Sequence, residues 1–134
     1  MSNKLVEDIK QEEGFRRFPY YCTEGKLTIG YGFNLEDVGL TEEECDAILK
    51  IRVRNLISQV KSSLYYLEIE DEAWEILYNM AFNLGLNGLL KFKKMIQCLK
   101  NEDYKQAAAE GRDSLWYRQV TNRAERMMSR LEKL

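Results

Sequence analysis

The sequence contains no histidine, and this absence excludes several kinds of catalytic chemistry. Nucleophilic machinery of the Ser-His-Asp or Cys-His type needs an imidazole base. The three cysteines, Cys22, Cys45 and Cys98, lie far apart and include no C-x-x-C pair. We therefore expect no structural zinc site, no fully paired disulfide framework and no cofactor.

Long hydrophobic runs are missing as well. The stretch MSNKLVEDIKQEEG lacks the apolar region of a signal peptide, and no stretch approaches the ~20 residues of a membrane-spanning helix. These features predict a protein without stable membrane insertion that remains in the cytoplasm where it is made. If its target lies outside the membrane, another component must let the protein through.

The residues that are present suit one soluble domain, since 45% of the 134 are hydrophobic and 31% are charged. Residues 1–87 carry 9 Lys and Arg against 16 Asp and Glu, whereas residues 88–134 carry 11 against 6. The basic half could attract an anionic polymer, although solvated lysines on helices are the more ordinary interpretation. The overall charge is slightly acidic and no nucleic-acid recognition motif occurs, so we expect no binding to nucleic acid. We also expect a monomer.

Sequence patterns predict a short helix, a small β region and then helices to the end of the chain. Aromatic and β-branched runs flank T-E-G near Gly25, which favours a hairpin. Thr41 and Glu44 form a capping box ahead of a long amphipathic helix over 42–62. The nearly apolar DEAWEILYNMAFNLG predicts a buried central helix that closes near Gly85. Shorter helices are expected at about 89–100, 102–110, 113–118 and 122–133.

These elements predict an α+β fold that is mostly helical, with a cleft between two lobes. Residues 13–40 would form the small β lobe, and residues 41–62 the bridging helix. Residues 63–134 together with 1–12 would form the helical lobe of a single catalytic unit over 1–134.

Glu13 is the first candidate catalytic residue. It ends the first predicted helix, where the helix dipole, the neighbouring carboxylates Asp8 and Glu12 and nearby aromatic rings would all raise a carboxyl pKa. A general acid needs such a shift. On these grounds alone, a solvated surface glutamate explains the residue better.

The spacing around Glu13 changes that interpretation. The stretch EGFRRFPYYCTEGKLTIGYG, with its E-x8-C-x5-T spacing, resembles the catalytic stretch of the phage-type lysozymes, glycoside hydrolase family 24. LYNMAFNLG at 77–85 looks like the central helix of that family, and LWYRQVTNRAERM at 115–127 is similar to its W-Y-x-Q-x-x-N-R-A-x-R segment. The resemblance covers nearly the whole chain in order.

The resemblance implies a lysozyme-like fold and a peptidoglycan hydrolase, an endolysin or muramidase that cleaves the β-1,4 bond between N-acetylmuramic acid and N-acetylglucosamine. Glu13 would be the catalytic acid, with Cys22 and Thr28 at the second catalytic positions of the hairpin. Arg123 matches the arginine that approaches the acid, so its charge would oppose the upward pressure on the Glu13 pKa. Saccharide-binding positions correspond to Asn34, Phe82 and Asn83, although a loop cap would also explain Asn34 and core packing would also explain Phe82.

Cys22 poses the main difficulty, because a free thiol with a pKa of about 8.5 is mostly uncharged at neutral pH. Three accounts stay open. Cys22 could act directly as a nucleophile or base, or it could only shape the site while Thr28 positions the water. Alternatively, Glu24 on the same hairpin could supply the negative charge. We favour a direct role, since some members of the family carry cysteine here.

The sequence departs from the family at Phe33, where a histidine is frequent, and in a shorter segment between hairpin and bridging helix.

The expected partner is the peptidoglycan glycan strand. The expected location is the host cytoplasm until lysis, with release through a holin or another membrane permeabiliser. Two other functions stay open: a lytic transglycosylase, and a non-catalytic peptidoglycan-binding relative.

Overall fold

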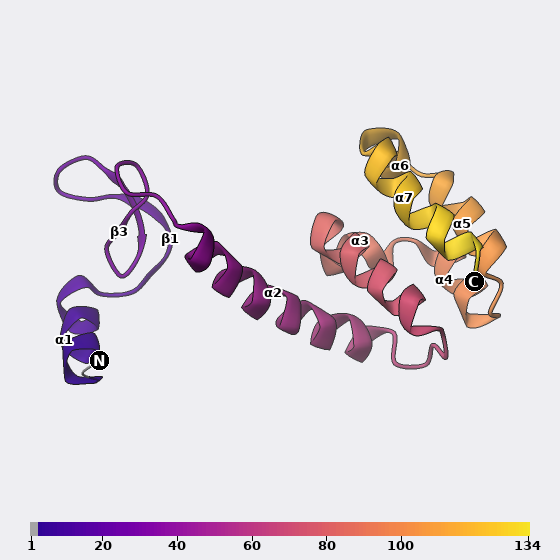
Figure 1. Cartoon of the computed structure of the whole chain (residues 1–134), viewed down its shortest axis with the longest axis horizontal. Helices are drawn as coiled ribbons and strands as arrows, with labels where there is room; N and C mark the ends of the chain where they lie inside the picture. The colour runs from indigo at the N-terminus through magenta and orange to yellow at the C-terminus, as the bar shows by residue number, and fades with distance from the viewer. Residues whose placement is uncertain (1–2) are drawn as a thin grey trace. The chain divides into compact units, whose positions relative to one another are not determined.

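The computed structural model describes residues 3–134, which form seven helices and one three-stranded sheet (Figure 1). The chain divides into two compact units, the first ending at Ile48 and the second running from Leu49 to Leu134. The prediction of a mostly helical α+β fold with a small β region is confirmed. The predicted division into lobes and the cleft stay predictions.

The first unit contains helix α1 (Asn3–Glu13) and strands β1 (Arg16–Tyr21), β2 (Leu27–Gly30) and β3 (Phe33–Asn34). The strands pair antiparallel in the order β1-β2-β3, with an irregularity in β1 between Arg16 and Tyr20. Helix α1 ends because Gly14 adopts a φ of +72° while its N–H still donates to the Lys10 carbonyl at 2.8 Å. The chain can therefore leave the helix directly after Glu13.

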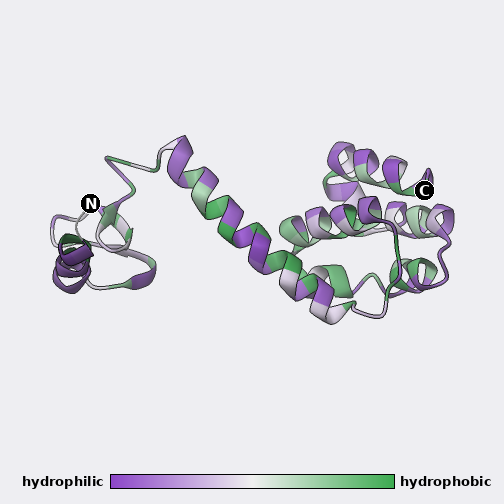
Figure 2. Ribbon diagram, turned by 60° about the horizontal axis from the view of Figure 1, so that its bottom comes forward, coloured by the Kyte–Doolittle hydropathy of each residue, from purple (hydrophilic) through white to green (hydrophobic). Residues whose placement is uncertain are grey.

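Helix α2 (Glu42–Ser63) begins at the predicted capping box, and its residues from Leu49 onward belong to the second unit. The Thr41 N–H donates to Glu44 Oε1 at 2.8 Å, and the Glu44 N–H donates to Thr41 Oγ1 at 3.1 Å. This reciprocal pair satisfies two of the backbone donors that every helix N-terminus leaves open. Hydrophilic and hydrophobic residues alternate along α2, as Figure 2 shows.

The second unit holds the hydrophobic core. Its helices are α3 (Asp71–Leu90), α4 (Lys93–Lys100), α5 (Tyr104–Arg112), α6 (Leu115–Gln119) and α7 (Thr121–Glu132). The predicted central helix is α3, and Gly85 interrupts its regular geometry with a φ of +78°. The core is built around large buried side chains that include Ile76, Leu77, Met80, Leu89, Leu99 and Met128.

Two of the short helices begin at side-chain caps that shift their predicted starts by about two residues. Asp103 accepts from the Gln106 N–H ahead of α5, and Ser114 accepts from the Tyr117 N–H ahead of α6. Such caps are typical of Asp and Ser, whose side-chain oxygens replace the missing carbonyl partners of the first turn. The C-terminal region therefore contains the predicted number of short helices with corrected boundaries.

An ionic network fastens α5 to α7. Arg112 donates to both Glu125 oxygens at 2.9 and 2.8 Å and to Glu132 at 2.7 Å. Tyr117 and Ser129 also donate to Glu125, at 2.8 and 3.0 Å. The hydrogen bonds from Arg112, then from Tyr117 and Ser129, lower the pKa of Glu125 to about 2. Charge-assisted bonds of this kind fix the orientation of α7, which carries Arg123.

Candidate functional site

Glu13 lies at the point where α1 meets the turn between β2 and β3. A Cβ placed on Gly32 would lie 2.7 Å from Glu13 Cδ and closer still to Glu13 Oε2, so the carboxyl group rests against the bare backbone of Gly32. Gly32 has a φ of +71°, which is a second reason for glycine at this position. The turn therefore provides a surface that receives the glutamate side chain, while Glu13 itself stays exposed to solvent.

Cys22 and Thr28 lie on the two arms of the hairpin. The Cys22 N–H donates to the Lys26 carbonyl at 3.0 Å, and the Gly25 N–H donates to the Cys22 carbonyl at 2.8 Å, which closes the turn. Gly25 has a φ of +77°, as the hairpin prediction required. In β2, Thr28 pairs with Tyr20 on one side and with Asn34 on the other.

The hairpin favours the charged form of the Cys22 thiol. Backbone hydrogen bonds from Lys26 and then Glu24 lower the pKa of Cys22, and a hydrogen bond from the Thr28 side chain acts in the same direction. Partial burial and the Glu24 carboxylate oppose the shift. Hydrogen bonds to a thiolate stabilise its charge, so the protein compensates in part for the high pKa of an ordinary thiol.

Thr28 is buried, with 3% of its surface exposed, and its hydroxyl donates to the Lys26 carbonyl at 2.8 Å. A hydroxyl has one proton, so it can serve either that carbonyl or the Cys22 thiolate at a given moment. The Thr28 proton and the charge on Cys22 are therefore coupled.

Asn34 has the properties of a loop cap. Its Oδ1 accepts from the Asp37 N–H at 2.9 Å, and its Nδ2 donates to Asp37 Oδ2 at 3.4 Å. Lys26 lies within 3.7 Å of the Glu36 carboxylate and 3.4 Å of the Asp37 carboxylate, so it ties this loop to the hairpin. One of the two interpretations of Asn34 thus has direct support, and binding of a sugar by the same amide stays a prediction.

Phe82 and Arg123 line one groove of the second unit, with a volume of about 290 Å³. Arg123 Nη2 donates to Asn79 Oδ1 at 2.8 Å, which holds the guanidinium against α3. Half of the Phe82 surface is exposed, so core packing does not explain this residue. An exposed ring beside hydrogen-bonding groups is a suitable surface for the apolar face of a sugar.

Asn83 accepts a hydrogen bond from Trp116 Nε1 at 2.8 Å. Trp116 is buried and packs edge-on against Phe92, with ring centroids 5.9 Å apart, as expected for a residue that holds the helical region together. The bond uses only the carbonyl side of the Asn83 amide, and the NH2 group keeps two donors for a ligand. Asn83 is therefore oriented by the core while it remains exposed.

The structure brings some predicted residues together within each unit. Cys22 and Thr28 share the hairpin of the first unit, and that unit also contains Glu13 and Asn34. Phe82, Asn83 and Arg123 belong to the second unit, where α3 and α7 carry them. Within residues 3–134, no group of three potential ligands is arranged to hold a metal ion. No helix in the same range is long and apolar enough to cross a membrane.

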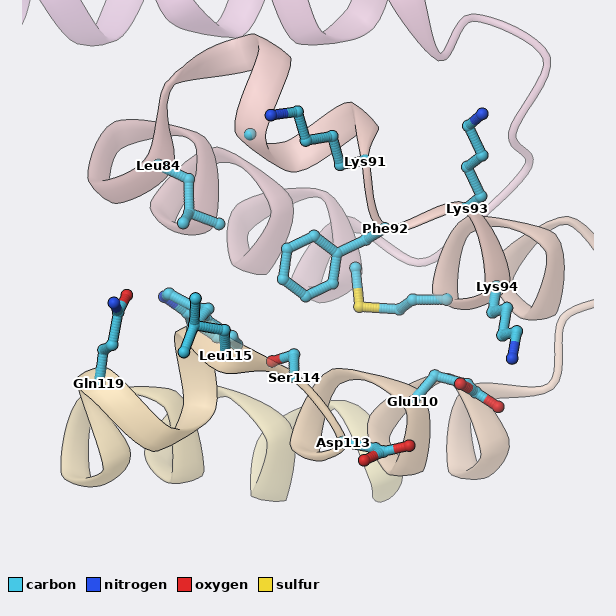
Figure 3. A pocket seen from close by; sticks show the side chains of 13 residues that line it. Leu84, Lys91, Phe92, Lys93, Lys94, Glu110, Asp113, Ser114, Leu115 and Gln119 are labelled. Carbon is cyan, nitrogen blue, oxygen red and sulfur yellow. The ribbon is translucent and has the colours of Figure 1, made fainter.

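A further hollow of the second unit was not predicted from the sequence. It has a volume of about 550 Å³ and lies between α4 and α6, where Phe92, Leu84 and Leu115 provide apolar walls (Figure 3). Charged residues of both signs, Lys91, Lys93, Lys94, Glu110 and Asp113, also line this hollow. None of the seven predicted site residues lines it. Because its walls come from two separate stretches, 84–95 and 110–119, no local sequence pattern indicates it.

Comparison with known proteins gives one family and several similar chains. Residues 10–132 match the phage lysozyme family. The chain is 25% identical to "Probable T4-type lysozyme 1" of Dictyostelium discoideum over 162 residues, covering 98% of this chain and 95% of that protein. It is 26% identical to an endolysin of Acyrthosiphon pisum secondary endosymbiont phage 1 over 114 residues, covering 82% and 76%.

A further similar protein is much longer. The pre-baseplate central spike protein of Enterobacteria phage T4 is 28% identical over 152 residues, which cover 92% of this chain and 26% of the spike protein. The chain thus spans about a quarter of the length of that relative. The residues that match the family, 10–132, include Glu13, the hairpin and the segment around Arg123.

Proposed function

The chain belongs to the phage lysozyme family, a family of glycoside hydrolases that act on peptidoglycan, and we propose that it cleaves the β-1,4 bond between N-acetylmuramic acid and N-acetylglucosamine. The observation that carries this proposal is the family match over residues 10–132, which includes every residue to which we assign a role. The Glu13 carboxyl group is exposed and rests against the backbone of Gly32, which supports the assignment of Glu13 as the acid.

In the proposed reaction, Glu13 donates its proton to the glycosidic oxygen as the bond to the sugar breaks. The sugar then develops oxocarbenium character, and a water molecule completes the hydrolysis after losing a proton. General acid catalysis of this kind contributes about 10²–10⁴-fold to the rate. Arg123 is proposed as a supporting residue of the catalytic site, because it lies in the segment that matches the family.

We assign Cys22 a direct role as base or nucleophile and Thr28 the positioning of the water. The hydrogen bonds that lower the Cys22 pKa support this choice among the three accounts, because they increase the thiolate fraction. The Glu24 carboxylate acts against the thiolate, so a negative charge at both positions at once is disfavoured. If position 22 acts as base or nucleophile, Cys22→Asp should retain activity, because a carboxylate can take the same role, whereas Cys22→Ser should lose most of it, since a serine hydroxyl does not ionise at neutral pH.

Asn34, Phe82 and Asn83 are proposed to contact the saccharide. The exposed Phe82 ring supports stacking on a sugar face, and the free NH2 group of Asn83 supports a hydrogen bond to a hydroxyl or acetamido oxygen. Asn34 would contribute through the loop that it caps. The biological role would be lysis of the bacterial wall, with a holin or another permeabiliser releasing the protein from the host cytoplasm.

Digestion of purified peptidoglycan followed by mass spectrometry of the muropeptides tests the proposal. Hydrolysis predicts products with a reducing N-acetylmuramic acid end. A lytic transglycosylase, which also needs an acid but no water-activating group, predicts anhydro products that are lighter by one water. Binding to peptidoglycan without any new ends would contradict both activities and support a non-catalytic relative.

A further inference from the structure

Helix α4 and the residue pair before it carry a concentrated positive charge. Lys91, Lys93, Lys94 and Lys100 lie within ten residues, and no acidic residue occurs between Glu75 and Glu102. All four lysines are exposed. Lysines on a helix usually serve solubility alone, so a binding role needs further observations on the same surface.

The first such observation is the lack of carboxylate partners. Elsewhere in the second unit, Arg112 and Arg130 form ion pairs with glutamates at 2.6–2.8 Å. Within the described residues, no ion pair or hydrogen bond engages the ammonium groups of Lys91, Lys93, Lys94 or Lys100. One of the four lysines lies beside an aromatic ring, since Lys100 Nζ is 5.8 Å from the ring centroid of Tyr66.

The second observation is a hollow that two of these lysines share. It has a volume of about 290 Å³, and its polar lining consists of Ser63, Tyr66, Lys93, Gln97 and Lys100. Lys93, Gln97 and Lys100 follow the i, i+4, i+7 spacing that places side chains on one face of a helix. Seven residues span about 10 Å of helix, so both flexible lysine side chains can reach a ligand lying over Gln97.

The lining is rich in hydrogen-bond donors. Each ammonium offers three N–H groups, and the Gln97 amide and the hydroxyls of Ser63 and Tyr66 can donate as well. No acidic residue lines the hollow. A ligand that suits it presents several acceptor oxygens and a full negative charge at neutral pH, which describes a phosphodiester, and carries hydroxyls that can pair with the amide.

Lys94 lies apart from this site. Figure 3 shows Lys93 and Lys94 leaving α4 in different directions, with Lys94 on the side of Glu110. Lys93 lines both hollows, whereas Lys94 lines only the larger one, where an anion would meet the carboxylates of Glu110 and Asp113. The charge of α4 is thus favourable to an anion at the hollow of Lys93 and Lys100 and less so on the other side.

We propose that this hollow is a non-catalytic binding site for a polyol-phosphate chain, the phosphodiester polymer attached to peptidoglycan in some bacterial walls. The proposal rests on the proposed function for its setting, since the wall is where the protein would meet such a chain. Charge complementarity between the lysine pair and the polymer phosphates supplies the attraction. A lipid bilayer fits less well, because the large apolar residues of α4, Met95, Ile96 and Leu99, are buried in the core and cannot enter a membrane.

The test is a binding assay with the full chain carrying Glu13→Gln, so that the wall is not digested during the measurement. Cosedimentation is measured with purified sacculi that retain their polyol phosphate and with the same sacculi after its chemical removal. We expect binding to the intact sacculi to be stronger and to weaken with added salt. Lys93→Gln combined with Lys100→Gln should weaken it about tenfold or more, because the double substitution removes both of the charges that attract the polymer phosphates.

The matched control combines Lys105→Gln with Lys133→Gln, which removes the same charge from exposed positions of the same unit. It should change binding less than about twofold. Equal losses in the two pairs would overturn the site, because net charge alone would then explain the effect. Equal binding to intact and stripped sacculi would overturn it as well.

Two further arms use double-stranded DNA and phosphatidylglycerol vesicles. The choice of partner would be overturned if either of them bound more tightly than purified polyol phosphate and if that binding depended on Lys93 and Lys100. Hydrolysis by the Lys93 and Lys100 variant is measured on polymer-free peptidoglycan in the parental Glu13 background, and it should remain unchanged. If the polymer does not bind but hydrolysis persists, only the proposed binding site is refuted. If the polymer binds but no variant hydrolyses peptidoglycan, only the proposed function is refuted.

Discussion

Gly32→Ala is expected to lower activity strongly by displacing the Glu13 carboxyl group while leaving the fold intact. The added Cβ would lie 2.7 Å from Glu13 Cδ, and ordinary contact begins at 3.4 Å, so the carboxyl carbon must move by about 0.7 Å or rotate away. Misplacement of a catalytic group by about 1 Å can lower the rate about 100-fold. We therefore expect kcat/KM to fall by roughly that factor, which corresponds to about 2.7 kcal/mol of transition-state stabilisation.

The loss of folding stability should be smaller than the loss of transition-state stabilisation. Gly32 has a φ of +71°, and an alanine there costs about 1–2 kcal/mol of folding free energy. Gly39→Ala is the matched control, because Gly39 has a φ of +66° and its added Cβ meets nothing closer than the Leu35 carbonyl oxygen at 3.9 Å. Both variants should lose similar stability in urea unfolding, and only Gly32→Ala should lose activity.

The assay is the release of reducing ends from purified peptidoglycan, at a temperature where circular dichroism shows both variants folded. Similar activity losses in the Gly32 and Gly39 variants would refute the reasoning, because backbone strain would then explain both. Full activity in Gly32→Ala would also refute it, since the Glu13 carboxyl group would not depend on its contact with the turn.

Two remaining predictions concern groups with shifted pKa values. Cys22 should be alkylated by iodoacetamide with a pH midpoint below the ~8.5 of a free thiol, because hydrogen bonds from Lys26 and Glu24 lower its pKa. Burial raises the pKa of Cys98, so the midpoint for Cys98 should be higher. Peptide mapping by mass spectrometry measures both midpoints, and a lower midpoint for Cys98 than for Cys22 would contradict the hairpin geometry. The Arg112 network should stabilise the fold above the ordinary glutamate pKa of about 4.3 and lose that contribution as the pH falls toward the Glu125 pKa of about 2. The difference in urea midpoint between the parent and Arg112→Met should therefore narrow from about pH 5 to pH 2, and a constant difference would show that the pairing is not linked to folding.

Local signals in the sequence were sufficient for many elements of the fold. The capping box at Thr41 and Glu44 has the predicted reciprocal bonds, because such a motif depends only on residues one helical turn apart. Gly25 provides the positive φ of the hairpin for a similarly local reason. Helix boundaries after Gly85 were less accurate, since the chain resumes helical geometry beyond the break and α4 begins only at Lys93.

Contacts between distant segments were not predictable in the same way. The packing of Glu13 on Gly32 joins residues 19 positions apart, and Arg112 joins two glutamates of another helix. The fall in the Cys22 pKa depends on the direction of backbone N–H groups in the turn, which composition does not reveal. The assignments of Glu13, Cys22 and Arg123 came from the order of motifs along the chain, and their catalytic roles stay predictions.

The most direct test of the central claim compares Glu13→Gln with Glu12→Gln in one turbidity assay on outer-membrane-stripped Gram-negative cells. The two substitutions remove the same charge from adjacent exposed positions of α1, and only Glu13 rests against Gly32. We predict that Glu13→Gln lowers the clearing rate by at least about 100-fold while Glu12→Gln remains near the parental rate. Equal rates for the two variants would contradict the account, because the proton would then come from another group.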